Sequence, residues 1–334
     1  MSFITFGEIM LRLTPSMHGA KINSTNFFQG SYAGSESNVA SSLGLLGNQV
    51  SYVTKLPQNQ LGDAAISSLR SYGINTDNIL RGGNRIGTYF VEIGASIRPS
   101  SVIYDRANSS ISEITREEIN WEQILENKKW LFLSGITPVL SAQCAAETIK
   151  AAEIAKKLGV KVGFDMNYRR SLWKHPSDAR KIFDQILEHT DLLFGNSGVL
   201  SDVYDLDFSG DTYEKTLDAA YKAAQKFGVK QIAFTVREHI TASKNRVSGI
   251  FLSDSQHRIS KTYDVSITDR FGTGDAFAAG CLHAIDRDWK GQEIIDFAAA
   301  AFALKHTIKG DQHTSSEKEI LSIMNGNIMG HVQR

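Results

Sequence analysis

The chain has 334 residues, enough for one large domain or two ordinary ones, and its 42% hydrophobic and 22% charged residues are typical of a globular protein. Its 36 Lys and Arg residues balance 36 Asp and Glu residues, so it lacks the positive field with which proteins usually bind nucleic acid. This balance argues against nucleic acid as a partner but leaves room for a local basic pocket that binds a small anion.

Short β-rich runs alternate with helical patterns along most of the chain. Helical patterns at 36–46, 141–158 and 211–227 each end next to a glycine, a common helix terminator, and a strand-like run soon follows. This order is one half of a βαβ unit, and its repetition predicts a mostly parallel sheet with helices on both faces. The runs expected to be buried strands are 2–7, 50–54, 130–134, 160–165, 191–194 and 230–236.

Two places break this alternation. Residues 86–93 and 101–105 are neighbouring strand-like runs with no helix between them, which predicts a hairpin or a small sheet at the edge of the main domain. A second β-rich pair, 247–252 and 257–263, follows the sixth strand. From Asp269 the chain is helical almost to its end. No linker divides the sequence, so we expect a single domain over residues 1–334.

Several features bear on the cellular location. Cys144 and Cys281 are far apart and have no partner at metal-ligand spacing, as expected in a reducing compartment. Residues 1–14 lack the basic lead and unbroken apolar run of a signal peptide, because Glu8 and Arg12 interrupt them. No apolar stretch approaches the length of a membrane span. We therefore expect a cytoplasmic protein without a membrane partner.

The strongest chemical signal is the segment 269–280, DRFGTGDAFAAG. Its two glycines permit a tight turn, and the helical pattern that begins near Asp275 would leave the N–H groups of Gly272, Thr273 and Gly274 at a helix N-terminus, where anions bind. A carboxylate next to a bound anion is unfavourable unless it has a function. Asp275 can accept the proton of a hydroxyl that attacks a phosphoryl group. Gly-x-Gly-Asp alone is equally consistent with an ordinary helix start capped by Asp.

The longer string Asp-x-x-Gly-x-Gly-Asp-Ala-Phe-x-x-Gly resembles the C-terminal signature of the ribokinase-like (PfkB) sugar kinases. The family's N-terminal signature, Gly-Gly followed by Asn-x-Ala, has its counterpart at 33–40, with Ala33 in place of the first glycine. Gly7-Glu8 matches the end of the family's first strand. The resemblance covers essentially the whole chain. It implies an α/β fold, the ribokinase-like three-layer α/β/α sandwich with a mostly parallel central sheet and a small β-sheet lid, formed roughly by 12–32 and 84–110.

The resemblance also implies ATP and Mg²⁺ as cofactors. Residues 196–199, Asn-Ser-Gly-Val, lack the Glu of the family's Asn-x-x-Glu, so the metal ligands stay unassigned. The family's Gly-x-x-Gly is missing at 235–239, where an arginine can pair with the ATP phosphates instead. Residues 300–306 resemble the helix that passes near adenine, although tight helix packing explains their small side chains equally well. The implied nucleotide contacts are Asn196, Thr235, Arg237, Gly272, Gly274 and Lys305.

The choice of substrate depends on whether two arginines converge. Arg106 lies on the expected lid and Arg169 follows the fourth strand, at the sheet edge where open α/β sheets bind ligands. Paired guanidinium groups match a carboxylate rather than a neutral sugar. The strings around these residues resemble the 2-keto-3-deoxygluconate kinases, whose product is 2-keto-3-deoxy-6-phosphogluconate. The implied substrate contacts are Gly34, Asn38, Tyr89, Tyr104, Arg106, Asp165, Asn167 and Arg169.

Other interpretations stay open at this point. Arg106 can instead pair with Asp105 or Glu92, and one of Arg169 and Arg170 is expected to be a surface residue. Without convergence, a fructokinase or another neutral-sugar kinase of the same family is the alternative. A dinucleotide-dependent oxidoreductase is disfavoured, because no Gly-x-Gly-x-x-Gly follows the first strand. The edge of the small sheet invites pairing with a second copy, so we expect a homodimer or higher homo-oligomer through the β-lid.

Overall fold

The computed structural model describes residues 3–17, 19–206 and 212–328. Its main sheet has ten strands in the order β13-β12-β11-β10-β9-β8-β1-β4-β5, with β14 beside β12. All six predicted strands are confirmed, within the described residues. The strands are β1 (Phe3–Phe6), β4 (Val50–Leu56), β5 (Ile79–Arg81), β8 (Trp130–Ser134), β9 (Lys161–Asp165), β10 (Leu192–Gly195), β11 (Gln231–Thr241), β12 (Lys244–Ser253), β13 (Gln256–Ile259) and β14 (Tyr263–Ser266).

The sheet is parallel from β5 to β11 and antiparallel only at its β12 end. The central strands are buried on both faces: every residue of β4 and of β8 is buried. Parallel strands of this kind need helices on both sides, because neither face can be left to water. The mostly parallel sheet predicted from the sequence is therefore confirmed.

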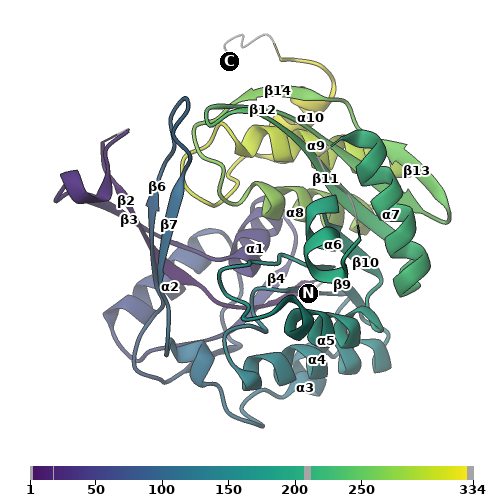
Figure 1. Cartoon of the computed structure of the whole chain (residues 1–334). Helices are drawn as coiled ribbons and strands as arrows, with labels where there is room; N and C mark the ends of the chain where they lie inside the picture. The colour runs from purple at the N-terminus through teal and green to yellow at the C-terminus, as the bar shows by residue number, and fades with distance from the viewer. Residues whose placement is uncertain (1–2, 18, 207–211, 329–334) are drawn as a thin grey trace.

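Helices cover the two faces and form the outer layers of the sandwich (Figure 1). Successive side chains of a strand point to opposite faces, so Phe3 enters one hydrophobic core and Ile4 the other. The predicted helix at 211–227 is present from Tyr213, whereas Asp211 lies outside the described residues. One core holds α1 (Ser35–Leu45), α2 (Gln60–Ser71), α8 (Thr273–Asp286), α9 (Gly291–Lys305) and α10 (Glu317–Met324), and the other holds α3 (Trp121–Leu125), α4 (Ala142–Lys157), α5 (Pro176–Leu187), α6 (Ser197–Tyr204) and α7 (Tyr213–Phe227).

A second, four-stranded sheet stands to one side of the sandwich (Figure 1). We call it the lid sheet, and the rest of the chain the body. Its order is β3-β2-β6-β7, and the predicted hairpin is confirmed as the antiparallel pair β6–β7. The bounds of its strands are β2 (Met10–Pro15), β3 (Phe28–Ala33), β6 (Thr88–Glu92) and β7 (Ser101–Asp105).

The strand order places a ligand-binding edge between β1 and β8. From β1 the chain moves to β4 and β5 on one side, and later from β8 toward β11 on the other. The carboxyl ends of the parallel strands at such a reversal leave a crevice where open α/β sheets bind ligands. Among the described residues, none of the helices combines the length and the apolar character needed to cross a membrane.

Candidate active site

The turn that opens α8 has the geometry that its two glycines predict. Gly272 has φ +73°, and a Cβ there would lie 1.8 Å from the carbonyl oxygen of Asp311, so no other residue fits. A Cβ on Gly274 would meet no atom within 4 Å, so space is open in front of this turn. The helix begins at Thr273, slightly earlier than expected. Its first N–H groups lack partners within the helix and are available to an anion.

Asp275, in the first turn of α8, has a buried carboxylate with one hydrogen bond to each oxygen. Asn38 donates its Nδ2 to one oxygen at 2.7 Å, and Ser35 donates its Oγ to the other at 2.8 Å. Asn167 donates in turn to Ser35 Oγ at 2.9 Å. Burial raises the pKa of the Asp275 carboxyl to about 7, against the effect of the hydrogen bond from Asn38. A carboxyl with a pKa near neutrality in a cavity wall is suited to accept a proton.

Two cavities meet at this carboxylate. The larger, of about 540 Å³, lies over the carboxyl ends of β9, β10 and β11. The smaller, of about 90 Å³, lies beneath the lid sheet at the strand-order reversal, where Glu8 follows β1 and Ile136 follows β8. After the contacts predicted for each from the sequence, we call them the nucleotide cavity and the sugar cavity. The residues that line both are Asn167, Arg169, Phe271, Gly272 and Asp275.

The sugar cavity collects most of the predicted substrate residues. Tyr89 and Tyr104 come from the lid sheet and stack with ring centroids 6.1 Å apart. Gly34 and Asn38 come from the start of α1, and a Cβ on Gly34 would lie 1.9 Å from the carbonyl oxygen of Glu8. Glycine is thus required at position 34 by close packing of the backbone.

Arg106 and Arg169 both line the sugar cavity, so the predicted convergence is present. Arg106 is buried, and its guanidinium is paired with Glu8. Its Nη1 is buried with no hydrogen-bond partner among the described residues. Because Glu8 already balances its charge, Arg106 contributes a directed N–H more than a net positive charge.

The ion pairs in this region decide whether Arg106 and Arg170 are ordinary surface residues. Asp105 pairs with Arg85 and Glu92 with Arg98, so neither is the partner of Arg106. Arg170 lines neither cavity and pairs with Asp202 in the wall of the larger one, and it is the surface member expected of the Arg-Arg pair.

Arg169 has a different environment from its neighbour. It lines both cavities, and its guanidinium makes one long hydrogen bond, 3.5 Å, to the carbonyl oxygen of Tyr168. It therefore presents most of its donors to the space between the cavities.

The nucleotide cavity holds the predicted residues Asn196, Thr235 and Arg237. Asn196 caps α6 by accepting the N–H of Val199 at 3.1 Å. Arg237 donates to Thr273 Oγ1 at 2.8 Å, which brings a guanidinium to the N-terminus of α8. Arginine next to helix amides makes this wall suited to phosphate groups.

Two predicted residues are placed differently from the rest. Asp165 lines the nucleotide cavity rather than the sugar cavity, and it accepts the N–H of Asn167 at 3.0 Å. Lys305 is fully buried, and its Nζ donates to the carbonyl oxygen of Ile308 at 3.0 Å. Lys305 does not line the nucleotide cavity, and its predicted contact with the nucleotide stays a prediction.

Sequence reasoning missed several residues that complete the site. Ser35 supports Asp275, and the hydroxyl of Tyr89 donates to Asp311 at 2.9 Å. Neither Ser35 nor Asp311 has a local pattern that distinguishes it from a surface residue. Glu8 belongs to the Gly7-Glu8 match, and its position soon after a buried strand indicates a residue at the ligand-binding edge of the sheet.

Comparison with known proteins decides the family. A model of the pfkB family carbohydrate kinases matches residues 2–318. The chain belongs to this family. The expected enzyme class, a sugar kinase, and the expected ribokinase-like fold are therefore confirmed.

Individual relatives act on sugar acids according to their names. A 2-dehydro-3-deoxygalactonokinase of Haloferax volcanii is 29% identical over 327 residues, covering 98% of both chains. The crystal structure of a 2-dehydro-3-deoxygluconokinase from Thermotoga maritima has a TM-score of 0.94 and 42% identity, again over 98% of each chain. A putative ribokinase II from E. coli in complex with ATP and Mg²⁺ shares the fold, with a TM-score of 0.81, 20% identity and 97% and 99% coverage of the two chains.

Proposed function

We propose that this PfkB kinase transfers the γ-phosphoryl group of ATP to the terminal hydroxyl of a sugar acid, 2-keto-3-deoxygluconate, to give the 6-phosphate. The observation that carries the proposal is the meeting of two cavities at Asp275, with Arg169 in the wall of both. The names of the relatives from Haloferax volcanii and Thermotoga maritima support the same substrate class. In this proposal the chain works as a single kinase domain that the lid sheet covers.

The chemistry follows from the residues around Asp275. Its carboxylate accepts the proton of the terminal hydroxyl while Asn38 and Ser35 hold it in place. The new O–P bond forms as the bond between the γ-phosphorus and the ADP oxygen breaks. The N–H groups at Gly272, Thr273 and Gly274 hold the charge that develops on the transferred group. The lid sheet keeps out water, which would otherwise accept the phosphoryl group.

ATP supplies the phosphoryl group and the leaving group. The arginine and helix N-terminus in the wall of the nucleotide cavity fit a polyphosphate, with Asn196 and Thr235 beside them. Within residues 3–17, 19–206 and 212–328, no group of three or more His, Cys, Asp or Glu side chains is placed to hold a metal ion. Mg²⁺ would therefore arrive on the phosphates, with water completing its coordination.

The test of the substrate is the identity of the product. Phosphorus NMR of the reaction with 2-keto-3-deoxygluconate should give a single monoester whose phosphorus couples to the C6 methylene protons. A phosphorylated neutral sugar, formed faster than this product, would favour the fructokinase-like alternative instead.

The pKa of Asp275 leads to a prediction about pH. A base must be deprotonated to act, and burial raises the pKa of this carboxyl to about 7. We expect kcat/KM to be level above neutral pH and to fall about tenfold per pH unit below about pH 7. The profile is measured with saturating ATP, and the ATP Kd over the same range is the control. A level profile down to pH 5.5 would contradict the base assignment.

We further propose that two copies associate through the outer face of the lid sheet. Leu13, Phe28, Phe90 and Ile103 lie on this face, opposite the buried side chains of the same strands, and Ile103 is 52% exposed. An apolar patch of this kind is suited to a symmetric contact with a second copy.

The predicted cytoplasmic location stays a prediction.

Ile103→Asp tests this association. Light scattering should give a dimer for the natural chain and a monomer for the variant, because a carboxylate in the contact loses its water. Ile97→Asp, at the exposed tip of the same hairpin, is the matched control and should stay dimeric. A natural chain that is monomeric at working concentration would rule out the dimer.

A further inference from the structure

A buried arginine of the lid sheet reaches across to the body. Arg12 lies in β2, yet only 2% of its surface is exposed. Its Nη2 donates to Asp269 at 2.7 Å and its Nη1 to Asp311, whereas its Nε donates to Thr14 of the lid sheet at 2.9 Å. Its guanidinium also lies 5.2 Å from the ring centroid of Phe271. One side chain thus joins the lid sheet to two separate segments of the body.

Both carboxylates that receive Arg12 frame the turn before α8. Asp269 accepts the N–H of Phe271 at 3.1 Å and that of Gly310 at 3.0 Å. The carbonyl oxygen of Asp311 lies directly against Gly272, where it leaves no room for a Cβ. Asp269 therefore fixes the start of the turn, and Asp311 belongs to the segment against which the turn packs.

The same carboxylates are linked to the sugar cavity. Tyr89, from β6, donates its hydroxyl to the second oxygen of Asp311 at 2.9 Å. Tyr89, Asp311 and Phe271 all line the sugar cavity, whereas Arg12 is not among the residues that line either cavity. Arg12 therefore acts on the site only through its neighbours.

We propose that Arg12 is a positioning residue for phosphoryl transfer, which holds the anion-binding turn in register only while the lid sheet is down. The inference rests on the proposed function. When the lid sheet lifts, Asp269 and Asp311 lose their ion pairs with Arg12, which is costly for buried carboxylates even though Lys305 still interacts with both. Their segments then lose the arrangement that sets Gly272, so lid closure and assembly of the anion hole are coupled.

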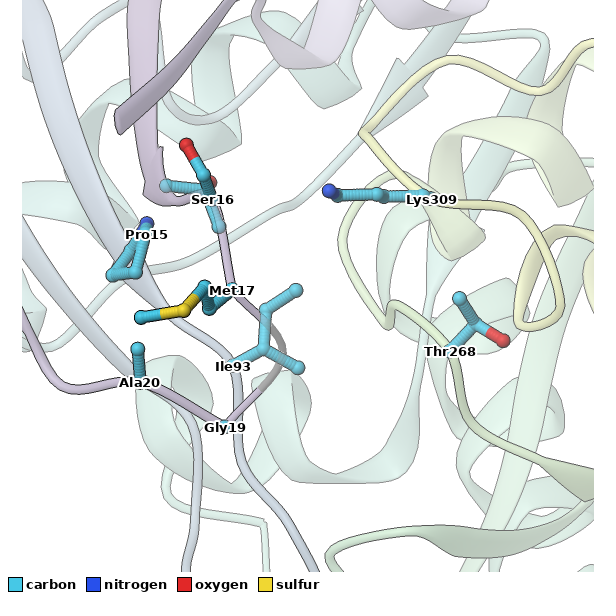
Figure 2. Close-up of a pocket in the computed structure, with 9 residues that line it drawn as sticks. Pro15, Ser16, Met17, Gly19, Ala20, Ile93, Thr268 and Lys309 are labelled. Carbon is cyan, nitrogen blue, oxygen red and sulfur yellow. The ribbon is translucent and has the colours of Figure 1, made fainter. Parts of the chain in front are cut away.

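The packing beside Arg12 supports a joint that can open. A cavity of about 160 Å³ separates the lid sheet from the body there. Figure 2 shows Met17 and Ile93 on the lid side, with Lys309 and Thr268 across the gap. Because this gap is not filled by side chains, the lid sheet is linked to the body beside it by the ion pairs of Arg12 and by the packing of Phe271 against the lid residues.

A second link between the lid sheet and the body lies at the hairpin tips. Ser96 accepts the N–H of Ala242 at 2.8 Å, and its own N–H donates to Ser243 Oγ at 2.7 Å. These bonds are exposed and exchange readily with water, so each contributes little. The link ties the tip of the β6–β7 hairpin, and it reaches the turn before α8 only through the side chain of Arg270, which donates to the carbonyl oxygen of Ala242 at 3.2 Å.

The test is Arg12→Gln in the full chain. We expect kcat for the sugar acid to fall about 100-fold, since a displacement of the order of 1 Å at the reacting groups has this effect. The ATP Kd should change far less than kcat, because only the turn is displaced and other residues of the nucleotide cavity, such as Asn196 and Thr235, stay in place. Hydrogen exchange should quicken in residues 269–274. Added methylguanidinium should restore part of kcat, since the gap beside Thr14 gives it a way in.

The controls separate this role from general stability. Arg85→Gln removes a lid arginine that pairs with Asp105 inside the lid segment, and it should change neither kcat nor exchange at the turn. If Arg12→Gln does not fold, Arg12→Lys keeps the charge without the fork and should lower kcat about tenfold. Unchanged kcat in a folded Arg12 variant overturns the proposal. If the natural chain does not phosphorylate the sugar acid, the proposed function fails, and unchanged exchange at 269–274 in the Arg12 variant would still overturn the positioning role.

Discussion

Asp275→Asn is expected to lower kcat by about 10³-fold without unfolding the enzyme. The change replaces a base by an amide of the same shape, and the loss of a positioned base has an effect of this order. The new amide can still accept from Asn38 and donate to Ser35, whose hydroxyl has a lone pair to spare. The hydrogen bonds that place the side chain are thus largely kept, while the proton acceptor is lost.

The raised pKa of Asp275 also predicts that the Asp275→Asn variant, although less active, gains stability relative to the natural chain as pH rises. The folded state raises the pKa of this carboxyl from 3.8 to about 7, so its contribution to stability is present at low pH and is lost as pH rises through about 7. The variant has no such loss, so its stability relative to the natural chain should increase between pH 4 and 8. Thermal unfolding at both pH values measures this, with ATP binding as the control. Turnover close to that of the natural chain would remove the base role.

Arg169→Ala should raise the KM for the sugar acid by about 10- to 100-fold. A hydrogen bond to a charged group contributes about 1.5–3 kcal/mol, and each 1.4 kcal/mol is a factor of ten. Arg169 faces the space between the cavities with most of its donors uncommitted, whereas Arg106 is balanced by Glu8. We therefore expect Arg169 to contribute most of the discrimination in favour of a carboxylate, which a neutral sugar lacks.

Arg170→Ala is the matched control for this prediction. It removes a neighbouring arginine that pairs with Asp202 outside the sugar cavity, and it should leave the KM for the sugar acid unchanged. Steady-state kinetics with one sugar acid and one neutral sugar measure both variants. Equal increases in KM for the two substrates in Arg169→Ala would mean that the arginine does not recognise the carboxylate.

The chemistry of the site was predictable where it is encoded locally. The turn at Gly272 and the carboxylate three residues later form one continuous segment, so the residues alone indicate an anion site with a base. The central strands were predictable for a similar reason, since strands buried on both faces are unbroken apolar runs. The start of α5 was missed although Pro176 stands at its first position, a recognisable helix signal.

The rest depends on contacts between distant parts of the chain. Arg106 was predicted as a substrate contact, with Asp105 or Glu92 in the lid segment as its alternative partners, but it pairs with Glu8 just after β1. Arg12 finds its carboxylates at Asp269 and Asp311, far along the sequence. Such ion pairs depend on which loops meet at the edge of the sheet. The order of charged residues along the chain does not predict them.

The central claim is the phosphorylation of a sugar acid, and ADP release across a panel of acceptors tests it most directly. With Mg-ATP fixed, kcat/KM is measured for 2-keto-3-deoxygluconate, 2-keto-3-deoxygalactonate, fructose, ribose and adenosine. We predict that a keto-deoxy acid exceeds every neutral acceptor by at least about 100-fold, with Arg169 responsible for most of the difference. A neutral sugar that matches or exceeds both acids would contradict the proposed substrate class.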